Sequence, residues 1–137
     1  MTAQAADLAI ALPTHLLDVN VLIAAITETH ALHTRAFAWI ADKQVMLCPL
    51  TELGYLRVST HPKILNVSMA DARKALEQFV KEHKVARIAD DVPALDTKPK
   101  KSEEVTDQYL AALAAKHRLR LATFDANIKH AAVDVIQ

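Results

Sequence analysis

Short apolar runs alternate along this chain with longer stretches in which apolar residues recur at helical spacing. A short apolar run is typical of a strand that is buried on both faces, whereas recurrence at every third or fourth position predicts an amphipathic helix. The runs that predict strands lie at about 15–18, 45–49, 85–88, 119–123 and 133–136. The stretches that predict helices lie at about 19–26, 31–43, 51–61, 69–83, 102–117 and 126–131.

Strands that alternate with helices predict a parallel sheet with helices on both faces. We therefore expect an α/β protein, specifically a three-layer α/β/α sandwich with a central parallel sheet. No repeat, low-complexity tract or long linker divides the chain, so residues 1–137 are expected to form a single domain, with 1–14 as a short N-terminal extension. That extension lacks the basic start of a signal peptide, and no apolar run reaches membrane-spanning length.

Composition excludes several classes of protein. Gly54 is the only glycine, whereas a dinucleotide-binding fingerprint or a P-loop needs several. Cys48 is the only cysteine, so it cannot form an internal disulfide, and we expect a reduced core thiol in a cytoplasmic protein. Sixteen acidic residues balance sixteen lysines and arginines, so the net charge does not argue for a nucleic-acid partner. If four acids gathered at one site, however, the rest of the surface would be mildly basic.

One acid stands at the junction between the first predicted strand and the first predicted helix. Asp18 follows the apolar run directly, and Asn20 comes two residues later. Because an unpaired buried carboxylate is costly, Asp18 should lie at the mouth of the strand and face solvent, a cation or a partner. In open α/β sheets this is the edge at which ligands bind. An N-cap of the helix is an equally good explanation of the same residue.

Three further acids occupy comparable places in the predicted fold. Glu52 opens the helix after the second strand, Asp107 lies in the first turns of the 102–117 helix, and Asp125 follows the fourth strand. Right-handed β-α-β units bring strand ends and helix starts to one edge, although Asp107 also needs its preceding loop to reach that edge. Clustered carboxylates repel one another unless a cation intervenes, and oxygen ligands suit Mg²⁺ or Mn²⁺. The pattern indicates metal-assisted phosphodiester hydrolysis, although each acid also has a capping explanation.

Two basic features could contact a phosphate backbone. The most loop-like stretch, DTKPKK at 96–101, carries Lys98, Lys100 and Lys101, which form either a solvated turn or a phosphate contact. Arg57, a little over one helical turn after Glu52, could contact phosphate or form a structural ion pair.

The stretches LLDVNVLIAA, CPLTELGYLRV and VTDQYLAALAAKHRLRLATFDANI together resemble the PIN-domain ribonucleases, specifically the VapC toxins of bacterial toxin–antitoxin pairs. The similarity spans roughly residues 15–136. It implies a PIN-like fold and a magnesium- or manganese-dependent endoribonuclease that acts in the cytoplasm. It also implies a small VapB-like antitoxin that fills the active-site groove, and a homodimer.

The resemblance assigns roles to individual residues. The acidic quartet of the family falls on Asp18, Glu52, Asp107 and Asp125. Asp18 and Asp107 are implied as direct metal ligands, while the other two acids complete the pocket. The supporting polar positions fall on Asn20 and Thr123, which would orient carboxylates or the attacking water.

Three alternatives were weighed against this interpretation. A haloacid-dehalogenase-type phosphatase needs a second acid where this chain has Asn20, which cannot donate or accept a proton in that role. A housekeeping PIN nuclease of RNA maturation would share the quartet. A PIN-like module that binds RNA or protein without cutting it would have no use for four unpaired acids. The RNA that is cut, the antitoxin, the number of metal ions and the dimer surface are left open by the sequence.

Overall fold

The computed structural model describes residues 13–137, and residues 1–12 of the expected N-terminal extension lie outside that part. The strands are β1 (His15–Leu17), β2 (Val45–Leu47), β3 (Ala86–Arg87), β4 (Arg120–Thr123) and β5 (Val133–Val135). The helices are α2 (Val19–Ile26), α3 (His33–Ile40), α4 (Pro49–Thr60), α5 (Met69–Glu82) and α6 (Val105–Lys116). Two short 3₁₀ helices, η1 (Ala94–Asp96) and η2 (Ser102–Glu104), precede α6.

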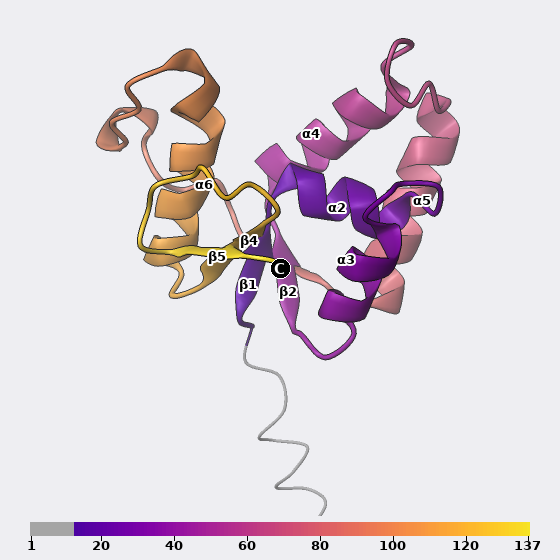
Figure 1. Cartoon of the computed structure of the whole chain (residues 1–137), viewed down its shortest axis with the longest axis horizontal. Coiled ribbons are helices and arrows are strands. Elements are labelled where there is room, and N and C mark those ends of the chain that lie inside the picture. Colours follow the sequence, from indigo (N-terminus) through magenta and orange to yellow (C-terminus); the bar gives the residue numbers. More distant parts are fainter. Residues whose placement is uncertain (1–12) are drawn as a thin grey trace, which may run out of the picture.

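The strands form one sheet in the order β3-β2-β1-β4-β5, and every neighbouring pair is parallel. In Figure 1, α6 covers one face of the sheet, and the other helices cover the opposite face. The predicted three-layer α/β/α sandwich is therefore confirmed. Because all strands run the same way, their carboxyl ends share one edge of the sheet, which lies at the top of Figure 1.

Two apolar clusters hold the layers together, one on each face of the sheet. Successive residues of a strand point to opposite faces. Leu16 of β1 accordingly packs with Leu110 on the α6 side, whereas Leu17 packs with Leu22 and Tyr55 on the side of α2 and α4. The central strand is thus buried on both faces, as its continuous apolar run predicts.

The start of α4 differs from the prediction, which made Thr51 the N-cap. Cys48 is the N-cap, and Pro49 is the first residue of the helix, where its missing N–H leaves no partner unsatisfied. Thr51 instead supports this start from within the first turn. Its hydroxyl accepts a hydrogen bond from the backbone N of Cys48 at 3.2 Å and donates one to the Cys48 carbonyl at 2.9 Å. Burial raises the pKa of the Cys48 thiol to about 11, which agrees with an inert core thiol.

The predicted helix at 126–131 is not formed, and irregular turns take its place. Two polar side chains instead accept hydrogen bonds from the backbone N–H group two residues further along the chain, as side chains do in local turns. Asp125 accepts from the backbone N of Asn127 at 2.8 Å, and His130 accepts from that of Ala132 at 3.0 Å. Such local bonds compete with helix formation.

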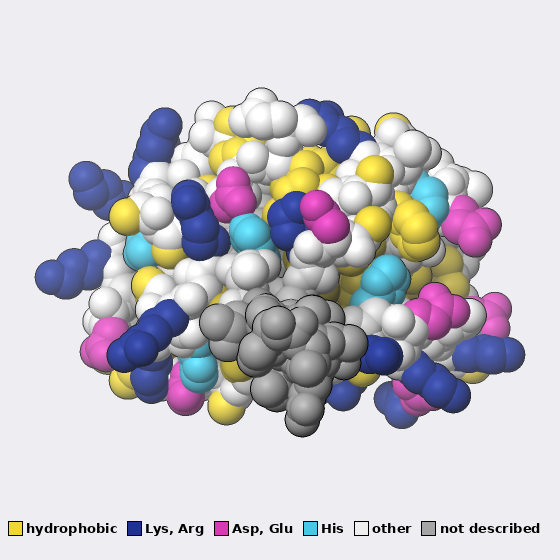
Figure 2. All heavy atoms as spheres, turned by 90° about the horizontal axis from the view of Figure 1, so that it is seen from below, with side chains coloured by type: hydrophobic (Ala, Val, Ile, Leu, Met, Phe, Trp, Pro, Cys, Tyr) yellow, Lys and Arg dark blue, Asp and Glu magenta, His cyan; other side chains and the backbone are white. Residues whose placement is uncertain are grey.

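Within residues 13–137, none of the helices combines the length and the apolar character needed to cross a membrane. Figure 2 shows the end of the molecule at which β1 begins, opposite to the carboxyl edge. Basic and acidic side chains are interspersed over it, and neither sign forms a continuous patch. This face therefore gives no reason to expect a nucleic-acid contact there.

Candidate active site

Asp18 lies at the carboxyl end of β1 and caps α2. Its side chain is buried, with the residue only 6 % exposed, and both oxygens accept hydrogen bonds. One accepts from the backbone N of Val19 at 2.7 Å, and the other accepts from the hydroxyl of Thr123 at 2.8 Å. Burial raises the pKa of Asp18, the two hydrogen bonds lower it, and burial dominates. Asp18 therefore both caps α2 and lies at the mouth of β1, so the two explanations of this residue are compatible.

The hydroxyl of Thr123 joins the start of α2 to the loop after β4. This fully buried residue donates to Asp18 and accepts from the side-chain nitrogen of Asn20 at 3.2 Å and the backbone N of Asp125 at 3.0 Å. Asn20 in turn accepts from the backbone N of Phe124 at 3.3 Å. The network leaves the Asp18 carboxylate little freedom to rotate. Asn20 and Thr123 thus lie where they can orient this carboxylate.

Asp107 lies in the first turn of α6, close to Asp18 and Asp125. Its pKa is raised to about 6, first by burial and then by the negative charges of these two acids. In the described part of the chain, the Asp107 side chain has no hydrogen-bond or ion-pair partner. The loop that carries η1 and η2 thus brings α6 to the carboxyl edge of the sheet. Three of the four predicted acids gather there.

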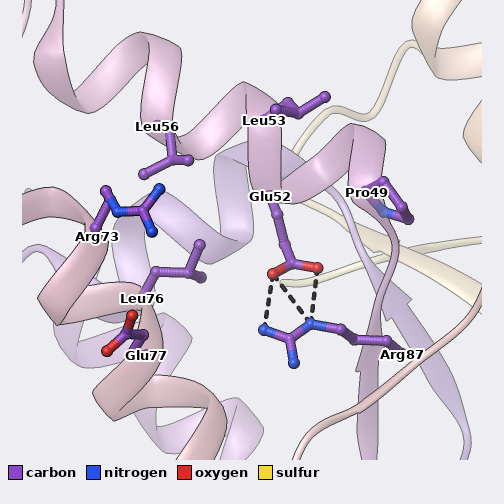
Figure 3. A pocket seen from close by; sticks show the side chains of 8 residues that line it. All are labelled: Pro49, Glu52, Leu53, Leu56, Arg73, Leu76, Glu77 and Arg87. Atoms are coloured by element: carbon purple, nitrogen blue, oxygen red, sulfur yellow. Dashed lines mark hydrogen bonds and ion pairs between the residues drawn. The ribbon is translucent and has the colours of Figure 1, made fainter. Parts of the chain in front are cut away.

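The structure departs from the sequence-based expectation at Glu52. Its carboxylate is held by Arg87 at the end of β3, with Nε to Oε2 at 2.9 Å and Nη2 to Oε1 at 2.9 Å (Figure 3). The strand order explains this pairing, because α4 starts above β2, and β2 has β3 on its far side from β1. Leu47 of β2 is in register with Arg87. The guanidinium that pairs with Glu52 therefore lies on the side of β2 away from β1, the strand that Asp18 follows.

Glu52 and Arg87 line a separate pocket of about 370 Å³ beside α5, together with Leu53, Leu56 and Leu76. Sequence reasoning missed Arg87, because an arginine at the end of a short predicted strand carries no signal of its partner. Only the relative order of β3, β2 and β1 pairs it with an acid from α4.

The three lysines of the 96–101 loop line the same groove as two of the clustered acids. This groove, here called the lysine groove, has a volume of about 600 Å³. Its lining includes Lys98, Lys100, Lys101, Asp107 and Asp125. Lys129, Glu103 and Glu104 line it as well. Lysines and carboxylates that face one groove suit an anionic polymer that also binds a cation.

Arg57 does not belong to this groove. It is exposed on α4 and forms no ion pair with any residue in the range 13–137. The structural ion pair considered for it is thus not formed there.

The donor set at the carboxyl edge fits a hard divalent cation. Asp18, Asp107 and Asp125 offer only oxygen ligands. Burial first, and then repulsion by the other two acids, raises the pKa of Asp107, and a cation would relieve this repulsion. Across residues 13–137, no three acidic, histidine or cysteine side chains form a ready-made metal cage. Mg²⁺ does not need such a cage, since it keeps several waters and commonly takes one or two carboxylates together with substrate phosphates.

Comparison with known proteins gives consistent matches over most of the chain. Residues 15–134 match the family model of the PIN domain. The chain is 38 % identical over 126 residues to Ribonuclease VapC38 of Mycobacterium tuberculosis, covering 82 % of this chain and 86 % of that relative. It is 35 % identical over 128 residues to Ribonuclease VapC44 of the same species, covering 86 % and 90 %.

A solved structure is similar in fold. It is a chain in the crystal structure of VapBC2 from Rickettsia felis bound to a DNA fragment from their promoter. The TM-score is 0.56 at 13 % sequence identity, with 83 % of this chain and 89 % of that chain covered. At this identity the likeness establishes the fold alone.

Proposed function

This chain belongs to the PIN-domain family, among the VapC ribonucleases, and from that premise we propose that it is an endoribonuclease toxin that hydrolyses RNA phosphodiester bonds. One observation carries the proposal. Asp18, Asp107 and Asp125 gather at the end of the sheet, and the latter two line the same groove as the three lysines of the 96–101 loop. A purely structural explanation does not account for Asp107, which has no partner among residues 13–137 and whose pKa is raised to about 6.

The proposed cofactor is Mg²⁺ or Mn²⁺, held by Asp18 and Asp107 with Asp125 completing the pocket. Such an ion, when bound, activates water and stabilises charge on the phosphate oxygens. Thr123 and Asn20 fix the orientation of the Asp18 carboxylate through their hydrogen bonds.

The remaining proposed site residues act around this centre. Lys98, Lys100 and Lys101 would bind the phosphates that flank the cut, because they line the same groove as the acids. Arg57 would contact RNA only outside that groove. Glu52 would contribute through water or after release from Arg87, since both of its oxygens are engaged by the guanidinium.

We also propose that a small VapB-like antitoxin neutralises the protein and that the toxin forms a homodimer acting on cytoplasmic RNA. The antitoxin proposal rests on membership of the VapC ribonucleases. For the dimer, two exposed apolar residues lie on helices that could pack against a second copy of the chain, namely Phe37 on α3 and Leu53 on α4.

The direct test is cleavage of labelled RNA with Mn²⁺, with and without EDTA. The wild type should cut only with the metal, and Asp18→Asn should lose about a hundredfold or more of the rate. Asparagine keeps an oxygen for the Val19 N–H, so circular dichroism should report an intact fold. Asp96→Asn, an exposed acid outside the lysine groove, is the matched control. Cleavage that persists in EDTA or in the Asp18 variant would overturn the metal mechanism, and RNA binding without cleavage would favour a non-catalytic module.

A further inference from the structure

The loop before α6 separates two hollows at the carboxyl edge of the sheet. Its residues alternate between them. Thr97 and Pro99 line one hollow, whereas Lys98 and Lys100 line the lysine groove. The first turn of α6 continues the same division, with Val105 and Thr106 on one side and Asp107 and Gln108 on the other. The two hollows therefore share a thin wall, and whatever occupies one is adjacent to whatever occupies the other.

The second hollow, here called the apolar hollow, has a volume of about 500 Å³. Leu50, Leu95, Val105 and Tyr109 supply its apolar surface. Leu95 is 94 % exposed and Val105 is 51 % exposed, so two aliphatic side chains are left open to water at one place. Large exposed apolar side chains that gather in one concavity mark a binding site more often than isolated ones do.

The rim of the apolar hollow carries one carboxylate, that of Asp90. Asp90 is exposed, and one of its oxygens accepts a hydrogen bond from the backbone N of Leu50 at 3.1 Å. A carboxylate has about four acceptor positions, so the exposed side of Asp90 can still receive N–H donors. The carboxylate also lies close enough to Tyr109 for its charge to act on the phenol. An occupant of this hollow should therefore have a flat apolar body and N–H donors at its edge.

We propose that the apolar hollow binds one nucleobase of the RNA next to the scissile phosphate, and that Asp90 selects a base with an exocyclic amino group over uracil. The inference rests on the proposed ribonuclease function and adds a specificity residue to it. Single-stranded RNA is recognised by contacts of its base faces with apolar and aromatic side chains and by hydrogen bonds to its base edges. Carboxylates accept hydrogen bonds from amino groups such as that of cytosine.

RNA fits the hollow better than an apolar protein segment does. A strand whose phosphates follow Lys98 and Lys100 needs to cross only the wall at Thr97 and Pro99 to place a base among Leu95 and Tyr109. An aliphatic side chain from a protein would fill the same volume but would supply no donor to the exposed side of the Asp90 carboxylate.

Binding in EDTA tests the inference without requiring cleavage. Short fluorescent single-stranded RNAs would be titrated against the wild type, each with one abasic position or with uracil in place of cytosine at that position. Asp90→Asn and Leu95→Ala are the informative variants, because both residues are exposed and neither change opens a core cavity. Asp96→Asn is the matched control, since this neighbouring exposed acid does not line the hollow.

We expect one position at which an abasic nucleotide or uracil weakens wild-type binding by about fivefold to tenfold. Asp90→Asn should abolish the preference over uracil, Leu95→Ala should weaken binding at the same position, and the control should behave as the wild type. If the wild type cuts RNA but shows no base-dependent position, the nucleobase inference fails and the ribonuclease function stands. Base-dependent binding without cleavage supports the inference and refutes the function, and absence of both RNA binding and cleavage refutes both. If Leu95→Ala weakens only the binding of a protein partner, the hollow is a protein site and the inference is wrong.

Discussion

Replacement of Asp107 by asparagine should stabilise the metal-free protein near neutral pH. The carboxyl lies beside Asp18 and Asp125, has no partner in the described residues, and has a pKa raised from 3.8 to about 6. A folded pKa above the unfolded one means that the folded state binds the proton more tightly than the unfolded state does. The wild type therefore loses stability as pH rises from about 4 to about 6 and does not regain it above that range. The neutral amide removes this loss.

The magnitude follows from the size of the shift and the exposure of the side chain. A difference of about two pKa units corresponds to about 3 kcal/mol when it is expressed in full. Asp107 is only partly buried, so solvent screening reduces the expected gain to about 1 kcal/mol. For a domain of this size, that gain corresponds to a rise in Tm of about 4 °C.

Thermal unfolding in EDTA, followed by circular dichroism at about pH 7.5 and about pH 4, measures the effect. Asp107→Asn should exceed the wild type in Tm at the higher pH and match it at the lower pH. Mn²⁺ should raise the Tm of the wild type and leave that of the variant nearly unchanged. Asp96→Asn, which removes an exposed acid, should shift neither. A variant that is less stable than the wild type at neutral pH, or equally changed at both pH values, would refute the argument from charge repulsion.

Three further changes test other parts of the structure. Glu52→Gln and Arg87→Gln should each lower the free energy of unfolding, measured with urea, by about 0.5–1 kcal/mol, and the double variant should lose no more than either single one. Additive losses would mean that the two side chains are not coupled. Gly54→Ala should destabilise by about 1–2 kcal/mol, because a Cβ there would lie 2.6 Å from a methyl of Val19, and the same change should become stabilising in a Val19→Ala background. Lys100→Ala should reduce the salt dependence of RNA binding by about 0.7 in the log–log slope; an unchanged slope would exclude a phosphate contact.

The hydrophobic pattern is sufficient to predict the strands and most helices of this chain. The spacing of apolar residues along an element reflects whether that element is buried on one face or on both. The predicted N-cap of α4, Thr51, lies three residues after the observed one, Cys48, since a proline that ends a strand and one that opens a helix look alike in sequence. The helix expected at 126–131 failed for a different reason. Asp125 and His130 satisfy backbone N–H groups locally, and the hydrophobic pattern carries no information about such bonds.

The gathering of Asp18, Asp107 and Asp125 could be predicted because it depends only on topology, which sends strand ends and helix starts to one edge. Glu52 starts its helix at that same edge, yet its side chain turns towards β3. Which way a side chain turns depends on its neighbours in space, and here the neighbour is Arg87, 35 residues away in the chain. The strand order that pairs them is the part of the fold that local patterns leave undetermined.

The balanced charge of the whole chain conceals an uneven distribution at the carboxyl edge. Carboxylates that repel one another are kept there by hydrogen bonds to Asp18 and by the packing of α6. Asp18 is held by a helix start and by Thr123, whose hydroxyl is buried in the core, and Asp107 is fixed by a helix packed against the sheet. The free energy gained by packing the layers thus holds together a cluster of acids whose mutual repulsion destabilises the fold. A site that is preorganised for binding is expected to have this arrangement. A bound cation would then lower the repulsion between these acids.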